Sequence, residues 1–391
     1  MASWTYDSFA NSSPANDVLN MSVGPAPVAM TTATTPSDSK QVANMLWTFA
    51  APLIFCTGVV GNVLILFVMS RRRMRGTTTS LYLRAMALGD LCALVTGIIP
   101  EWLEATDIVV FKRLHPVTCK LEKFSFFTCG DTAIWILVVF TVDRFIAVAF
   151  PLCKKHMCLY GRARIYCLLT LVAAAAKNTH VFWTRGAVYT FNARLNVTEV
   201  NNCGQPPPYA HFERFVRPWI AFTIISVIPF CVLLFCNTWI IKVLLDVKRM
   251  RENQPLAGRP KDKALVQMTA MCLSASFCFL LCISPSIVLL IGRPYWTSSE
   301  HENNIYYICK SVSNQLVYVN HSANFFLYCL TGRRFRQELV LLCACRKSYG
   351  AGASASESKA TLYKFTTNVH RNNAHKGAIR GDFIHMKVRR I

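Results

Sequence analysis

Seven apolar runs dominate the chain, and the first of them sets the strongest constraint. Residues 41–70 contain no Asp, Glu, Lys or Arg, and about 20 apolar residues in a helix are enough to cross a bilayer. The fourth run is the weakest, because Lys177 interrupts it. The other apolar runs cover residues 81–102, 119–150, 165–184, 219–241, 264–292 and 311–332. We therefore predict an all-α fold, a bundle of seven transmembrane helices.

The composition agrees with a membrane protein rather than a soluble one. Of 391 residues, 53% are hydrophobic and 16% are charged, whereas soluble proteins carry about 25% charged residues. The net charge of +22 raises the alternative of nucleic-acid binding. The basic residues lie between the apolar runs and in the C-terminal tail, however, so membrane topology explains them better. We expect a lipid bilayer as partner and no nucleic acid.

The distribution of the basic residues predicts the orientation. Lys and Arg gather after the first, third, fifth and seventh runs, and short basic loops remain in the cytoplasm. We therefore expect a multi-pass protein of the plasma membrane with its N-terminus extracellular. Residues 1–40 lack the apolar core of a cleavable signal peptide, so the first run would act as its own insertion signal. Three glycosylation sequons fall on the exterior side, at Asn11, Asn20 and Asn196.

Composition also divides the chain into three parts. Residues 1–40 are polar and rich in Ser, Thr and Pro, which predicts a disordered extracellular tail. Residues 41–345 form the seven-transmembrane domain with a short amphipathic eighth helix at its end. Residues 346–391 begin with a low-complexity linker and continue as a basic polar segment, which predicts a disordered cytoplasmic tail.

Four of the polar residues inside the apolar runs are Asn62, Asp90, Asn320 and Asn324. A polar group inside a bilayer is unfavourable unless it has a partner or a role. One interpretation is that each residue only holds two helices together. The alternative, which the whole set favours, is a single polar core around Asp90.

The order and spacing of several motifs resemble those of rhodopsin-like (class A) G-protein-coupled receptors. The resemblance covers roughly residues 42–345, and segments such as HSANFFLY and NTHVFWT are most similar to divergent invertebrate neuropeptide receptors of the FMRFamide-like kind. The motifs that carry it are Gly61-Asn62-Val63, Leu88-Gly89-Asp90, Asp143-Arg144-Phe145 with Pro151-Leu152, Pro229, Phe279 to Pro285, and Asn324 to Tyr328.

This resemblance implies a cell-surface receptor that binds an extracellular ligand and activates heterotrimeric G proteins. It implies a Cys119–Cys203 disulfide, and arrestin binding through the Ser- and Thr-containing tail. Cys343 and Cys345 follow the amphipathic segment, the usual setting for palmitoylation. The residues that it assigns to activation and G-protein coupling are Asp143, Arg144, Phe145, Pro285, Asn324 and Tyr328.

The sequence also departs from the family pattern at informative positions. Phe325 stands where the seventh helix usually has a proline, so we expect a less kinked helix. Asn237 stands where a tyrosine usually helps to hold the active state.

Two residues that other receptor classes use to bind their ligands are missing here, which narrows the class of ligand. Phe126 stands where amine receptors place an Asp, and Tyr318 stands where opsins place the retinal-binding Lys. A peptide, or another ligand with an anionic group, fits the remaining cations and aromatic rings better. The candidate ligand-binding residues are Lys123, Phe126, Phe127, Lys177, His180, Gln315 and Tyr318.

Two other classes of protein are alternatives to a receptor. A channel or secondary transporter could use the buried Asp90, Asp131 and Lys177 as an ion path, but such proteins often show internal repeats or broken helices. A membrane enzyme would need a nucleophile–base pair or a metal cluster, and neither is visible in the sequence. We therefore expect no enzymatic activity, no cofactor and no metal site.

Overall fold

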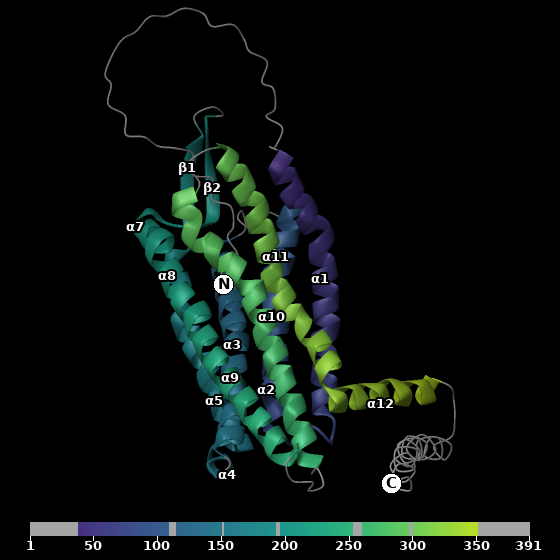
Figure 1. The fold of residues 1–391 in the computed structure, drawn as a ribbon. Coiled ribbons are helices and arrows are strands. Elements are labelled where there is room, and N and C mark those ends of the chain that lie inside the picture. Colours follow the sequence, from purple (N-terminus) through teal and green to yellow (C-terminus); the bar gives the residue numbers. More distant parts are fainter. Residues whose placement is uncertain are drawn as a thin grey trace, which may run out of the picture. The chain divides into compact units, whose positions relative to one another are not determined.

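A computed structural model describes residues 38–108, 115–150, 152–192, 196–252, 260–296 and 300–350. The chain divides into two compact units, with the boundary between Phe335 and Arg336. The first unit contains the helical bundle and one β-hairpin, and its elements are coloured in chain order in Figure 1. Each unit is described by itself.

The first three long helices are α1 (Asp38–Ser70), α2 (Thr78–Ala105) and α3 (Pro116–Ala149). Local sequence sets their starts. The Thr77 hydroxyl accepts a hydrogen bond from the Ser80 amide at 3.1 Å and caps α2, as threonine commonly does at this position. Pro116 occupies the first turn of α3, where its missing N–H costs nothing.

The fourth apolar run also forms a helix. A short turn, α4 (Lys154–Met157), precedes α5 (Tyr160–Asn178), which continues almost directly into α6 (Val181–Thr184). Lys177 lies in the last turn of α5 and does not break it. An antiparallel hairpin follows, made of β1 (Gly186–Asn192) and β2 (Val197–Gly204). The sequence had indicated only a loop in this region.

The fifth apolar run belongs to one long, irregular helical segment. Two π-helical turns, η2 and η3, interrupt it, and such turns bend a helix locally. The second lies one turn before Pro229. The pieces are α7 (Pro207–His211), η2 (Phe212–Val216), α8 (Arg217–Ala221), η3 (Phe222–Val227) and α9 (Ile228–Glu252).

Two long helices and a shorter one complete the described chain: α10 (Pro260–Trp296), α11 (Glu300–Thr331) and α12 (Arg333–Gly350). The helix α11 continues through Phe325 without a break, as the missing proline predicts. Phe335 on α12 is buried, whereas its neighbours Arg334 and Arg336 are exposed, which is the amphipathic pattern expected of the eighth helix.

The long helices run back and forth, so the first unit has two ends (Figure 1). We call them the hairpin end, where β1 and β2 lie, and the α4 end. Within the bundle α11 packs between α1 and α10, and α2 packs between α1 and α3. The basic loops after α1 and α3 lie at the α4 end.

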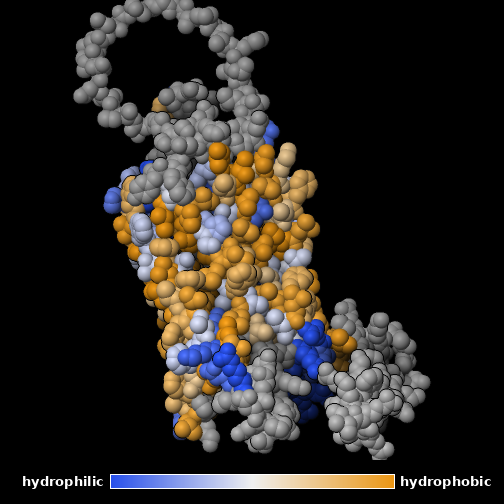
Figure 2. Space-filling model, viewed as in Figure 1, coloured by the Kyte–Doolittle hydropathy of each residue, from blue (hydrophilic) through white to orange (hydrophobic). Residues whose placement is uncertain are grey.

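Much of the bundle surface is apolar. Hydrophobic side chains cover most of the visible face in Figure 2, and large residues such as Phe49, Leu53 and Leu168 are exposed. Among the described residues, six helical segments are long and apolar enough to cross a membrane. The long helix α11 is not among them, because it carries many polar residues. Several of these, including Asn314, Gln315 and His321, are buried.

A disulfide joins Cys119 on α3 to Cys203 on β2, with their Cα atoms 5.5 Å apart. This is the pairing that the resemblance implied. It ties the hairpin to the hairpin end of α3, which places β2 over the outermost turns of the bundle. Both cysteines are buried, so the bridge is shielded from reducing agents.

We expect Cys203→Ser to reduce the amount of protein at the cell surface, because removing a native disulfide typically costs about 2–5 kcal/mol of stability. Cys309→Ser is the matched control, since Cys309 is an exposed free cysteine. Flow cytometry of intact cells measures both. Equal surface levels for the two variants, or free thiols at both positions in peptide maps, would contradict the structural role of the bridge.

Candidate functional site

One deeply buried charged site surrounds Asp90 on α2, whose exposed fraction is 1%. One carboxylate oxygen lies 2.7 Å from His321 Nδ1, and the other accepts a hydrogen bond from Asn324 Nδ2 at 2.7 Å. Asn62 on α1 donates to the His321 carbonyl at 2.9 Å. Three helices therefore meet at one polar core, because a buried carboxylate requires compensating partners.

His321 is the residue that sequence reasoning missed in this core. We had expected Asn320 to contribute, but Asn320 is only half-buried and has no hydrogen bond to Asp90 in the described part of the chain. His321 is completely buried. Its position three residues before Asn324 was the available signal, because residues three or four apart share a helix face and Asn324 binds the same carboxylate.

Close approach of α1 and α11 supports the polar core. A Cβ atom at Gly61 would lie 2.8 Å from the Cβ of Phe325. Glycine is therefore required at this crossing, as small residues generally are where transmembrane helices touch.

A second site lies near the α4 end of α3. Arg144 pairs with the carboxylate of Asp143, and its Nη2 atom donates to the Thr78 hydroxyl on α2 at 2.8 Å. Its guanidinium also lies 5.5 Å from the centre of the Phe140 ring. Arg144 and Asp143 are buried, with exposed fractions of 8% and 4%. The arginine is therefore held in place by α2 and α3 together.

Residues around Arg144 connect α3 with the helices next to it. The Phe145 ring packs against Phe235 and Trp239 of α9, with centroids 5.7 and 6.2 Å away. On the neighbouring pair of helices, Asn237 of α9 donates a hydrogen bond to the Ser276 hydroxyl of α10 at 3.1 Å. The asparagine thus provides a direct link between α9 and α10.

Tyr328, near the end of α11, is fully buried. Its ring lies edge-on to Phe335, with the ring centres 6.2 Å apart. Phe325 packs on the same Phe335 ring, at 5.9 Å. The aromatic cluster fixes the last turns of α11 where the chain enters α12.

Asp131 and Lys177 form a buried ion pair between α3 and α5. Lys177 Nζ lies 2.7 Å from Asp131 Oδ2, and Asn178 Nδ2 donates to the same oxygen at 2.7 Å. The exposed fraction of the side chain is 1% for Asp131 and 23% for Lys177. In the described residues, no hydrogen bond or ion pair connects this cluster with Asp90.

Lys123, expected to face an anionic ligand, is enclosed instead by two carboxylates. Its Nζ atom lies 3.1 Å from Glu122 Oε1 and 3.6 Å from Glu101 Oε1. Its side chain is only 2% exposed. The ammonium group is thus held inside the protein, near the hairpin ends of α2 and α3.

Four aromatic rings form a row beneath this cluster. The Tyr318 ring lies 5.7 Å from Phe126 and 5.9 Å from Trp47, and Phe126 lies 5.6 Å from Phe127. A Cβ atom at Gly97 would lie 2.6 Å from both the Phe126 and Tyr318 rings. The glycine therefore lets α2 lie directly against the row.

Another charged cluster lies beside Phe127. Glu213 binds Arg217 at 2.7 Å and Arg185 at 3.2 Å through the same carboxylate oxygen. His180 Nε2 lies 4.0 Å from the other oxygen. The Arg217 guanidinium is 5.8 Å from the centre of the Phe127 ring. The predicted ligand residues Phe126, Phe127, Tyr318 and His180 therefore belong to one continuous series of side-chain contacts. The Lys177 side chain pairs with Asp131 instead.

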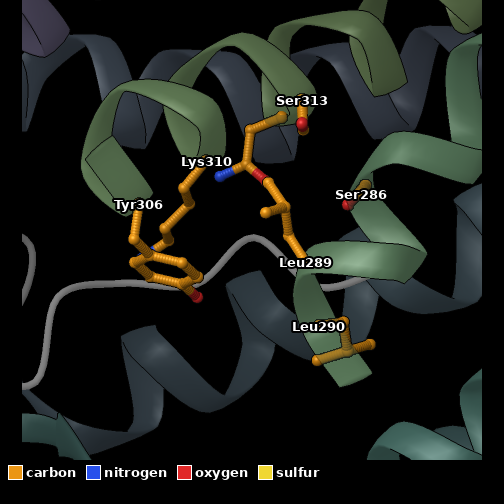
Figure 3. Close-up of a pocket in the computed structure, with 7 residues that line it drawn as sticks. Ser286, Leu289, Leu290, Tyr306, Lys310 and Ser313 are labelled. Atoms are coloured by element: carbon orange, nitrogen blue, oxygen red, sulfur yellow. The ribbon is translucent and has the colours of Figure 1, made fainter. Parts of the chain in front are cut away.

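A small, partly open cavity lies between α10 and α11. Figure 3 shows its lining, with Leu289 of α10 lying toward the side chains of α11. The lining residues are Ser286, Leu289, Leu290, Tyr306, Lys310, Ser313 and Asn314. The cavity lies one turn beyond Pro285 toward the hairpin end.

Comparison with known proteins adds independent information. Residues 61–328 match the family described as 7 transmembrane receptor (rhodopsin family). The chain is 26% identical over 296 residues to the FMRFamide receptor of Drosophila melanogaster, covering 73% of this chain and 51% of that protein. The match thus spans about half of that relative's length.

For two further relatives, the match covers a larger share of the relative's own length. A probable G-protein coupled receptor of Caenorhabditis elegans is 23% identical, over 82% of this chain and 74% of its own length. The human growth hormone secretagogue receptor type 1 is 26% identical, over 77% of this chain and 84% of its own length.

The Asp131–Lys177 pair can be tested by thermal unfolding of the detergent-solubilised protein. Asp131→Asn leaves the ammonium group without its counter-ion and should cost about 1–3 kcal/mol, less than a fully buried pair because Lys177 is partly exposed. Adding Lys177→Met should restore most of the loss, since replacing both partners is often neutral. Asp246→Asn, at an exposed position, is the control. A double variant as unstable as Asp131→Asn would rule out the ion pair as the cause.

Proposed function

Because this chain belongs to the 7 transmembrane receptor (rhodopsin) family, we propose that it is a cell-surface receptor that binds an extracellular peptide and activates heterotrimeric G proteins. The names of two relatives support a peptide ligand: an FMRFamide receptor and a growth hormone secretagogue receptor. The aromatic row with a charged cluster at each end supports it too, since a peptide offers both charges and apolar side chains. The receptor would have no chemistry of its own.

In this proposal the hairpin end is extracellular and the α4 end is cytoplasmic, within the plasma membrane. The basic loops at the α4 end favour this orientation. Asn196 of the third sequon is exposed at the tip of the hairpin, with a φ of 50°, and would be accessible for glycosylation. Staining of an N-terminal epitope on intact cells tests the orientation directly.

The observation that carries the function is the position of Arg144. It lies near the cytoplasmic end of α3, held by Asp143, Thr78 and the Phe140 ring. In the active receptor, α10 would move outward at this end, and Arg144 would become available to a helix of the G protein. Pro285 is the flexible point, because it cannot donate a hydrogen bond to the carbonyl of Leu281.

The remaining assignments are also proposals. Asn11 and Asn20 lie outside the described residues, as does the tail that would bind arrestin beyond residue 350. Cys343 and Cys345 fall on the helical backbone of α12, but their side chains are not among those described. Palmitoylation there would anchor α12 to the membrane surface. Hydroxylamine-sensitive acyl labelling tests it.

We expect Arg144→Ala to abolish peptide-stimulated nucleotide exchange while leaving surface expression and peptide binding largely intact. Asp143→Asn should raise basal exchange, because it frees the guanidinium. Arg162→Ala removes the same charge from an exposed position on the same end and serves as the control. The assay uses membranes with purified G protein, after a peptide library has supplied the agonist.

Lysine should not replace Arg144, because only the planar guanidinium donates in several directions at once. An Arg144→Ala receptor that reaches the surface, binds peptide and still drives full exchange would reject this mechanism.

A further inference from the structure

The charged cluster on α2 and α3 has an excess of negative charge. It contains two carboxylates, Glu101 and Glu122, and one ammonium group, Lys123. Their side chains are 14%, 9% and 2% exposed. The formal charge of the cluster is therefore −1, and such a charge acts strongly where water is largely excluded.

The neighbouring cation does not cancel this excess. Arg185 also acts electrostatically on Glu122 and Lys123, but its guanidinium donates to Glu213 at 3.2 Å. Glu213 binds Arg217 as well. That cluster has two guanidinium groups and one carboxylate, so its formal charge is +1. The two clusters are therefore oppositely charged.

Two buried polar groups on α11, one helical turn apart, have no hydrogen-bond partner among the described residues. One is the Tyr318 hydroxyl, on a side chain with an exposed fraction of 1%, and the other is Gln315 Nε2, on a side chain that is 8% exposed. Glu101 and Glu122 both act electrostatically on the Tyr318 hydroxyl. Buried polar atoms are rarely left unsatisfied, so each unpaired group is suited to a polar atom supplied from outside.

The aromatic row connects the two clusters. The Tyr318 ring lies at the acidic end, and Phe126 and Phe127 continue to the Arg217 guanidinium. Aromatic faces attract cations, so two interactions would stabilise a positive group lying against Tyr318 and Phe126. It would contact the ring faces and also the surplus carboxylate charge.

We propose that Glu101 and Glu122 bind a guanidinium or ammonium group of the activating peptide. The Tyr318 hydroxyl accepts a hydrogen bond from that group, and Gln315 Nε2 donates to a backbone carbonyl of the peptide. The oppositely charged cluster at Arg217 faces the peptide's carbonyl or carboxylate oxygens, which sets the direction of binding. This proposal rests on the receptor function proposed above and specifies its ligand chemistry.

The test uses a synthetic library of short peptides, applied to the full-length receptor with a promiscuous G-protein readout. Wild type, Glu101→Gln and Glu122→Gln are compared at matched surface levels. Glu104→Gln, on the same helix one turn away, is the control for the charge change. Each peptide that activates the wild type is remade with citrulline in place of arginine, or norleucine in place of lysine.

We expect the active peptides to contain Arg or Lys, and their neutral analogues to lose about 10- to 100-fold in potency, as for a hydrogen bond between charged groups. Glu101→Gln should cause a similar loss for the parent peptide and little further loss for the analogue. Glu104→Gln should match the wild type. A small further loss when Glu101→Gln is combined with the neutral peptide means that the two changes are not additive. A direct contact predicts this result, and a purely structural effect does not.

Three results would overturn the proposal. Equal potency of parent and neutral peptides on the wild type would exclude a cationic contact and leave the peptide-receptor function intact. Losses that multiply between Glu101→Gln and the neutral peptide would assign the carboxylates a structural role only. If no peptide activates a wild-type receptor that reaches the surface, the receptor function itself fails, and this inference with it.

Discussion

The buried carboxylate of Asp90 fixes the arrangement of the helices around it. A charge in this environment is unfavourable by several kcal/mol unless it is paired and hydrogen-bonded, and its partners come from α11. His321 and Asn324 bind its two oxygens, while Asn62 of α1 binds the His321 backbone. The position of α11 then determines which side chains meet at the hairpin end and at the α4 end of the bundle. Toward the hairpin end it places Tyr318 beside the acidic cluster, and toward the α4 end it places Tyr328 against Phe335.

The helix α10 is attached differently from its neighbours. It packs mainly on α11 and has little contact with α3 and α9. Among the described residues, one hydrogen bond joins it to α9, a neutral one from Asn237 to Ser276, and such bonds contribute only about 1 kcal/mol. In the proposed mechanism, α10 would move at its α4 end, with Pro285 as the flexible point. Because α10 supplies no partner to Asp90 among the described residues, this motion would leave the polar core intact.

The sequence predicted the seven spans, because apolar runs and basic loops depend only on the bilayer. It could not assign partners to buried charges, since these depend on which helix faces meet. Lys177 was expected to interrupt a span, yet its pairing with Asp131 lets it remain inside the helix. Lys123 was expected to bind an anionic ligand, yet Glu101 and Glu122 reverse the sign of its surroundings. His321 was overlooked because a histidine in an apolar run has no distinctive periodicity of its own.

In the proposed mechanism, peptide binding at the hairpin end moves the α4 end of α10. Double electron–electron resonance spectroscopy on the purified receptor measures this motion. Nitroxide-bearing residues are introduced at position 162 of α5 and position 270 of α10. We expect the distance between the two labels to increase when agonist peptide and G protein are both present, and to remain short in the absence of peptide. An unchanged distance under conditions that support full nucleotide exchange would contradict this movement of α10.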